Sequence, residues 1–256
     1  MSRWWMVLIL SFNVVGSVGW AACSARSGAM TTALVELYTS EGCSSCPPAD
    51  RQLSQFPDGR FPLDKAVPLA LHVPYWDYIG WKDPYAKSVF AERQNWLVQT
   101  NRHRTVYTPH FFVSGKAVGN WRNELPDVIR RINAQPAHAD IQLRVDKLQP
   151  GLLSIGADTS SAMKSESLAL YLAVTENRLV SKVSRGENSG TTLHHDHVVR
   201  EWIGPLALVA GKASVQRDLK LQADWVGNEI GVVGLVQNTL SGEVIQAVAV
   251  NRCFKS

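Results

Sequence analysis

Two cysteines separated by two serines, Cys43 and Cys46, form the clearest reactive motif of the chain, in the segment CSSCPP. A thiolate is the nucleophile of disulfide exchange, so a working pair needs one sulfur with a lowered pKa and a second sulfur within reach. A soft cysteine pair can also bind Cu(I) or Zn(II), or act as a permanent crosslink. The motif therefore leaves a redox dithiol, a metal clamp and a structural staple as interpretations.

The elements around the dithiol can position it. Residues 33–38 form an apolar run rich in strand formers, which ends at the cysteine loop. After the loop, apolar residues recur at i, i+4 and i+7, so we expect a helix that begins at about Pro47, with Cys46 near its N-cap. The unpaired N–H groups and the dipole of a helix N-terminus favour negative charge, and this would stabilise a thiolate.

The rest of the first half continues the same alternation. Residues 66–73 predict a second buried strand, and Asp83 followed by Pro84 predicts the start of a helix that reaches about Gln99. A hairpin strand over 105–113 with its return strand follows, and then an amphipathic helix with Leu125, Val128, Ile129 and Ile132 on its inner face. Reactive groups in such α/β sheets lie at the carboxyl ends of the strands, where the dithiol is placed.

The second half has a different texture. Residues 133–140 are polar and contain Pro136, so they predict a linker. Beyond it, short alternating runs separated by glycine turns predict an antiparallel sandwich. We therefore predict a first domain over 31–135 and a β-sandwich domain over 140–256.

The N-terminus predicts export. Arg3 precedes an apolar stretch over residues 4–20, and small residues follow, which is the order of a secretory signal peptide. We assign residues 1–25 to it, with cleavage after Ala22 or Ala25. An uncleaved anchor fits less well because three polar residues interrupt a short stretch. The expected location is periplasmic or secreted, with no membrane contact after cleavage.

The chain has four cysteines in 256 residues, too few for a disulfide-built scaffold, so a hydrophobic core must hold the fold. We expect Cys23 and Cys253 to be isolated thiols, with a bridge between them as the alternative. The formal net charge is +4, and no run of Lys or Arg is dense enough for a nucleic-acid surface. We therefore predict no nucleic-acid partner.

The order of elements, the C-x-x-C after the first strand and the later segment VYTP resemble the thioredoxin superfamily over residues 31–133. The segments VELYTSEGCSSCPPAD, HVPYWDYIGWKDPYA, RGEN and LHHDHVVR resemble, more narrowly, a family of exported bacterial thioredoxin-like proteins of unassigned function. The resemblance implies an α/β thioredoxin-like domain, which the all-β antiparallel sandwich domain would follow.

The resemblance also assigns roles to single residues. Pro109 would be the cis proline that faces the dithiol, and Thr108 would present its backbone to a substrate peptide. Cys43 would attack and Cys46 would resolve. Glu36 would be the buried acid that moves protons beneath the dithiol, although it lies one position further from Cys43 than in the superfamily; an edge or surface glutamate is the alternative.

Two further groups are candidates. An aromatic loop either lines a substrate groove or pins itself to the core, and we assign to substrate binding Tyr75, Trp76 and Trp81. In LHHDH, His195 and His197 would share one strand face as a possible metal pair, but no third ligand is visible, and we expect a hydrated turn and no metal site. Arg185, Glu187 and Asn188 in RGEN form a charged turn, for which one reading is that it braces Asp196 through an ion pair.

These residues predict an exported thiol-disulfide oxidoreductase that acts on protein thiols or disulfides without a cofactor. The spacer Ser44-Ser45 carries no cation, so the direction of electron flow stays open. The alternatives are a copper- or zinc-handling protein that uses the same cysteines and a non-catalytic thioredoxin-fold binding module whose disulfide is a staple.

Overall fold

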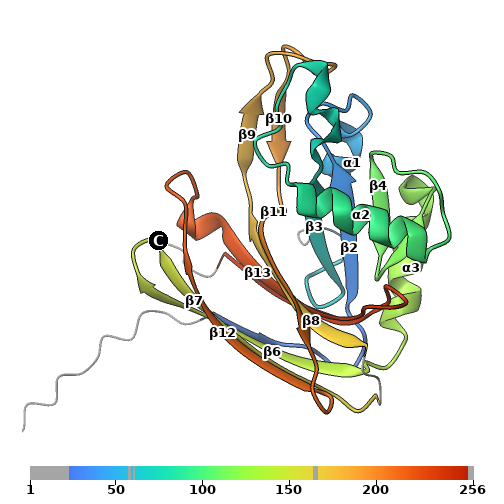
Figure 1. The fold of residues 1–256 in the computed structure, drawn as a ribbon, viewed down its shortest axis with the longest axis vertical. Coiled ribbons are helices and arrows are strands. Elements are labelled where there is room, and N and C mark those ends of the chain that lie inside the picture. The colour runs from blue at the N-terminus through green and yellow to red at the C-terminus, as the bar shows by residue number, and fades with distance from the viewer. Residues whose placement is uncertain (1–22, 57–58, 60, 164–166, 253–256) are drawn as a thin grey trace, which may run out of the picture.

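The protein is represented by a computed structural model that describes residues 23–56, 59, 61–163 and 167–252 (Figure 1). The helices among these residues are α1 (Pro47–Ser54), α2 (Ser88–Thr100) and α3 (Trp121–Asn133), with short 3₁₀ helices η1 (Pro74–Ile79) and η2 (Gly227–Glu229). No helix of the described chain is long and apolar enough to span a membrane.

One mixed sheet of eight strands runs through the molecule. Its strands, in spatial order, are β14 (Val244–Asn251), β13 (Ile230–Asn238), β8 (Leu168–Glu176), β11 (Val198–Ala207), β3 (Ala66–His72), β2 (Ala33–Thr39), β4 (His110–Val113) and β5 (Lys116–Val118). Every residue of β2, β3 and β8 is buried. Strands covered on both faces are expected to be mostly apolar, as these three are.

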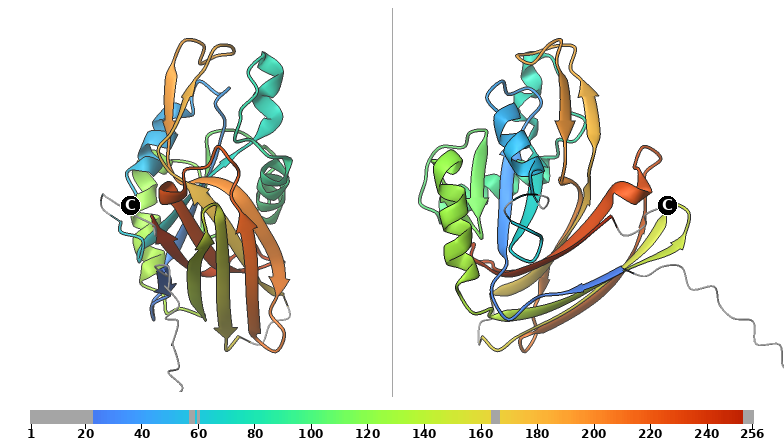
Figure 2. Two further views of the ribbon diagram at one scale, coloured as in Figure 1. Left: turned by 90° about the vertical axis from the view of Figure 1, so that its left-hand side faces the viewer. Right: turned by 180° about the vertical axis from the view of Figure 1, so that it is seen from behind.

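A second sheet covers one half of the first. Its antiparallel strands, in spatial order, are β1 (Cys23–Arg26), β6 (Ala139–Gln149), β7 (Leu152–Ser161) and β12 (Lys212–Lys220). The two sheets face each other across an aliphatic core that includes Ile141, Leu143, Ile155, Leu172 and Val232 (Figure 2). Burial of these side chains holds the sandwich together.

Helices cover the other half of the large sheet on its two faces. Along β2 successive side chains alternate in direction. Leu34 and Tyr38 pack in the cluster that contains α2, whereas Val35 and Leu37 pack in the cluster that contains α1 and α3. We call these sides the α2 face and the α1 face.

Strands β9 (Leu179–Lys182) and β10 (Thr192–His195) form a separate two-stranded antiparallel ribbon. Residues 179–195 are called the arm below. The arm rises from the end of the large sheet (Figures 1 and 2); β10 contacts α1, and Gly186 near the tip of the arm lies close to Ile79 of η1.

The predicted fold class, an α/β thioredoxin-like domain followed by an all-β antiparallel sandwich domain, is wrong. Strands from both sides of the predicted linker share the eight-stranded sheet: β11 pairs in parallel with β3 at Val198 and Ala70, and the N–H of Ala70 donates to the carbonyl of His197 at 2.9 Å. An unpaired β3 would expose a row of backbone groups, and β11 covers that edge. The predicted domain limits, 135 and 140, lie near the end of α3 and the start of β6, within one continuous structure.

Three local predictions can also be compared with the structure. Helix α2 begins at Ser88, not at Asp83; one Asp83 oxygen accepts the N–H of Tyr85, but only a turn follows there. Cys23 is disulfide-bonded, so the expectation of an isolated thiol is wrong. The predicted signal peptide lies outside the described residues except for 23–25, which belong to β1.

Candidate disulfide site

Cys43 and Cys46 form a disulfide where the loop after β2 enters α1. Their Cα atoms are 5.4 Å apart, and Cys46 is the N-cap residue of α1, as predicted. The carbonyl of Cys46 accepts the N–H groups of Ala49 and Asp50. The pair therefore sits at the positive end of the helix dipole.

The disulfide is covered. Cys43 and Cys46 have no exposed surface, whereas the spacer residues Ser44 and Ser45 are exposed. The Oγ of Ser45 lies 3.3 Å from the Sγ of Cys43. A partner that attacks either sulfur must first displace the groups that cover the pair.

The arm supplies one side of this cover. The side-chain amide of Asn188 donates to the carbonyls of Glu41, at 2.8 Å, and Cys43, at 3.0 Å. The N–H of Ser44 donates to the Glu187 carboxylate at 3.0 Å. These contacts correct the expectation for the RGEN turn, because Asp196 instead accepts the backbone N–H of Arg178.

The loop of η1 supplies the other side. A Cβ on Gly42 would lie 2.9 Å from the Cβ of Trp76, so the cysteine loop and η1 are in close contact. The indole N–H of Trp76 donates to the hydroxyl of Thr108 at 2.7 Å, and that of Trp81 donates to the Glu41 carboxylate at 2.7 Å. Of the three predicted aromatic residues, Trp76 and Trp81 thus lie at the site.

Tyr75 points away from this group. Its hydroxyl donates to the side-chain oxygen of Gln94 on α2 at 3.2 Å, and burial raises the pKa of Tyr75 to about 12. It anchors η1 to α2.

The Thr108–Pro109 bond is cis, as predicted. β4 pairs with β2 so that His110 stands opposite Tyr38, which brings Thr108 and Pro109 to the end of β2 where the cysteine loop begins. Trp76 contacts both Thr108 and the cysteine loop. The structure thus brings the cysteines, Thr108 and Pro109 to the same end of the strands, next to the C-terminus of β2.

Glu36 does not join them. It lies on the α2 face, where its carboxylate accepts from Arg93 at 2.7 Å and from the hydroxyl of Tyr38 at 3.2 Å. The glutamate is fully buried, so a surface position is also excluded. Because α1 covers the opposite face, the structure gives no support to a proton-carrying role for Glu36 beneath the disulfide.

A different buried group lies on the α1 face, and sequence reasoning missed it. We call it the acid–histidine cluster; its members come from the loop after β2, from α1, β3 and the loop after η1, and from the arm, and they are Glu41, Asp50, His72, Asp83 and His195. All five side chains are at least nine-tenths buried.

Two contacts organise the acid–histidine cluster. The Nδ1 of His72 lies 2.7 Å from the Asp83 carboxylate, and the Nε2 of His195 lies 3.1 Å from the Glu41 carboxylate. The two imidazole rings are 4.9 Å apart, edge to face. Asp83 also accepts the N–H of Glu41 at 2.9 Å, so the two pairs are linked.

The charges in this cluster depend on one another. Although burial opposes the charged forms of both residues, Asp83 raises the pKa of His72 and His72 lowers the pKa of Asp83. Burial raises the pKa of Asp50, while His195 and His72 act against that rise. The cluster can therefore hold or release protons next to the disulfide.

The less favoured reading, in which His195 and His197 share a metal on one strand face, does not match the contacts of the two side chains. His195 contacts Glu41, whereas the Nε2 of His197 contacts the carbonyl of Phe56. Both side chains are buried, so the expected hydrated turn is wrong. The described residues contain no group of three or more histidine, cysteine or acidic side chains that could hold a metal ion.

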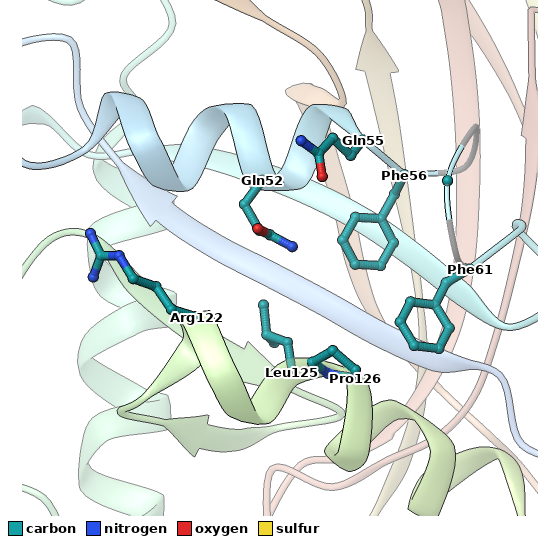
Figure 3. A pocket seen from close by; sticks show the side chains of 8 residues that line it. Gln52, Gln55, Phe56, Phe61, Arg122, Leu125 and Pro126 are labelled. Atoms are coloured by element: carbon teal, nitrogen blue, oxygen red, sulfur yellow. The ribbon is translucent and has the colours of Figure 1, made fainter.

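A surface pocket of about 320 Å³ lies away from the disulfide, between the C-terminal half of α1 and the start of α3 (Figure 3). Phe56 and Phe61 stack along one side with ring centroids 5.9 Å apart, and Arg122 lies across from α1. None of its lining residues belongs to the site described above.

Comparisons with known proteins agree with the fold. The chain is similar to a protein from Agrobacterium tumefaciens whose crystal structure is known, with 21% identity, a TM-score of 0.61 and coverage of 90% of this chain and 98% of that one. It is also similar to HBP35 of Porphyromonas gingivalis, with 16% identity, a TM-score of 0.68 and coverage of 88% and 76%. No curated protein matches the chain. The family model described as protein of unknown function (DUF1223) matches residues 34–237, so the chain belongs to this family.

Proposed function

We propose that the protein is a thiol-disulfide oxidoreductase whose Cys43–Cys46 pair exchanges with protein thiols or disulfides. The observation that carries this proposal is the position of the disulfide, at the start of α1 and at the same end of the sheet's strands as the cis Thr108–Pro109 bond. At this position the helix dipole favours a thiolate, which is the form needed for exchange. The resemblance to the thioredoxin superfamily enters here for the site alone and not for the whole fold.

The reaction balances without a cofactor. A partner thiolate attacks one sulfur of the disulfide and forms a mixed disulfide, and the other sulfur leaves as a thiolate. A second partner thiol then displaces the enzyme sulfur, so the partner gains a disulfide while Cys43 and Cys46 each end as a thiol. The reverse sequence reduces a partner disulfide. In this reverse direction, we assign attack on the partner disulfide to Cys43 and resolution of the mixed disulfide to Cys46.

Two protons move between the partner and the two cysteines in each cycle, and the acid–histidine cluster lies where they can be held. Asp50 follows Cys46 by one helical turn, so both project from the same side of α1. Because burial raises the pKa of Asp50, its carboxyl group can accept a proton more readily than an exposed aspartate.

A permanent structural crosslink is the second candidate, because the complete burial of both cysteines favours it. Such a disulfide would resist reduction at the potentials at which exchange proteins work. The structure offers no comparable observation in favour of copper or zinc handling.

Mixed-disulfide trapping separates the two candidates. Insulin, a disulfide-containing probe, is incubated with reduced Cys46→Ser and Cys43→Ser variants. We expect Cys46→Ser to accumulate a mixed disulfide through Cys43, because its resolving thiol is missing. Accumulation only in Cys43→Ser would reverse the roles, and accumulation in neither would favour the crosslink.

Export also stays a proposal. We propose a periplasmic or secreted location from the N-terminal residues alone. An oxidising compartment would suit the Cys43–Cys46 disulfide and the disulfide-bonded Cys23. Detection of the processed protein outside the cytoplasm tests it.

A further inference from the structure

The turn at the tip of the arm makes polar contacts with the backbone that surrounds the disulfide. Asn188 donates to the carbonyls of Glu41 and Cys43, and Glu187 accepts from the N–H of Ser44. Two acceptors and one donor of the cysteine loop are thus satisfied by side chains more than 140 residues away in the sequence. We call residues 185–189 the cap.

We propose that the cap occupies the surface on which a partner polypeptide docks, and that the partner must displace it before exchange with Cys43 and Cys46. This inference rests on the proposed function and names how access to the same site is controlled. The partner is a polypeptide segment that offers N–H or amide donors to the two carbonyls and an acceptor to Ser44.

The construction of the arm suits displacement. Among the described strands, β9 and β10 pair only with each other, whereas each inner strand of the large sheet pairs with two neighbours. In the cap, Arg185, Glu187 and Ser189 are exposed, and Asn188 alone is buried. The cap holds the cysteine loop through three hydrogen bonds, and its Gly186 also lies against the side chains of Ile79 and Trp81. These contacts are easier to open than a cover that depends on apolar core packing.

The arm is nevertheless fixed at its base. His195 contacts Glu41 in the acid–histidine cluster, and the hydroxyls of Ser181 and Tyr85 lie 3.3 Å apart. Opening of the cap alone, with the base in place, would uncover the cysteine loop and leave the cluster intact. The inferred motion is therefore local to residues 185–189.

The test compares exchange kinetics of the full chain with and without the cap contacts. Asn188→Ala removes two hydrogen bonds to the cysteine loop, and Glu187→Ala removes the third. Ser189→Ala is the matched control, because its hydroxyl bonds the carbonyl of Ser184 within the same turn. A short synthetic peptide with two reduced cysteines serves as the probe, and its oxidised form drives the reverse reaction.

We expect Asn188→Ala to react roughly tenfold faster than the natural protein in both directions, because a removed barrier accelerates both by one factor. Glu187→Ala should show a smaller acceleration, and Ser189→Ala none. The reduction potential should stay unchanged. If Asn188→Ala does not fold, the exchange rate of Glu187→Ala serves as the test of the cap.

Unchanged rates in both cap variants, with a working redox couple in the natural protein, would overturn the cap while leaving the proposed function in place. A shift in potential without a common acceleration would also overturn it, because the contacts would then stabilise one redox state. If no variant reacts with the peptide in either direction, the proposed function itself fails.

Discussion

The two faces of the large sheet each bury a carboxylate against a positively charged or protonatable side chain. On the α2 face, Glu36 pairs with Arg93, which also donates to Gln237 of β13 at 3.0 Å and lies 4.4 Å from the ring of Trp202. On the α1 face, the acid–histidine cluster pairs its acids with His72 and His195. Both groups join segments from the two halves of the chain.

The difference lies in the cation. Arginine keeps its charge at every pH at which proteins fold, so the α2 face holds a constant ion pair. Imidazole changes charge near neutral pH, so the α1 face can exchange protons. The titratable acid–histidine cluster stands on the same face as the disulfide and the Glu36–Arg93 pair does not, and this arrangement suits the proposed thiol chemistry.

Loss of the Glu36–Arg93 ion pair should produce the largest effect on stability. We expect Arg93→Leu to lower the free energy of unfolding by about 3–5 kcal/mol, because Glu36 would remain buried without its cation. Denaturant unfolding measures this change. The double variant Glu36→Gln/Arg93→Leu should recover a large part of it, and a loss below about 1 kcal/mol in the single variant would show that Arg93 is not needed as a charge partner.

Loss of the His72–Asp83 pair should have a smaller effect that depends on pH. We expect His72→Gln to cost about 2 kcal/mol, the scale of a hydrogen bond to a charged group. The raised pKa of His72 means that its contribution is complete below the unfolded pKa of about 6.5 and is lost as pH rises through the higher folded pKa. The lowered pKa of Asp83 means that its contribution is present above about pH 3.9 and is lost as pH falls through the lower folded pKa.

The difference in unfolding free energy between natural protein and His72→Gln should therefore be greatest between about pH 4 and pH 6.5. Unfolding curves over this range and at pH 8 provide the measurement. A difference that grows as pH rises toward 8 has the opposite sign and would contradict the pairing.

The smallest expected effect is a gain in stability. Asp50 has a raised pKa because it is buried, so its ionisation opposes folding at pH values above its folded pKa and has no effect below the unfolded pKa. We expect Asp50→Asn to stabilise the protein by about 1 kcal/mol at pH 7, with the gain vanishing in acid. Asp127→Asn, at an exposed ion pair, is the control and should change stability by less than about 0.5 kcal/mol. A destabilising Asp50→Asn at pH 7 would show that the charged carboxylate is held by the cluster.

The local elements around the disulfide could be predicted from the sequence. The apolar period predicts the start of α1 at Pro47, and the C-x-x-C motif identifies Cys43 and Cys46, because both signals depend on neighbours along the chain. The cis Pro109 follows from the resemblance to the thioredoxin superfamily and not from its neighbours. Glu36 was placed on the correct strand, but its face depends on the alternation along β2, and that alternation directs it to Arg93.

The long-range contacts could not be predicted in the same way. Asn188 and His195 reach the site only because β11 pairs with β3 and the arm lies beside α1. Nothing in the period of either half encodes that pairing. Asp83 has the ordinary signal of a helix N-cap and accepts the N–H of Tyr85, but its other oxygen contacts His72 on β3, a contact that no local pattern predicts. Unusual polar residues at the ends of buried strands, Glu41 and His72, were the only available signal of the cluster.

Redox titration of the protein, with thiol trapping of Cys43 and Cys46 at each potential, tests the central claim most directly. Exchange chemistry predicts a two-electron couple between about −120 and −270 mV that disappears in Cys43→Ala. A pair that stays oxidised below about −300 mV would contradict the claim and identify the disulfide as a structural crosslink.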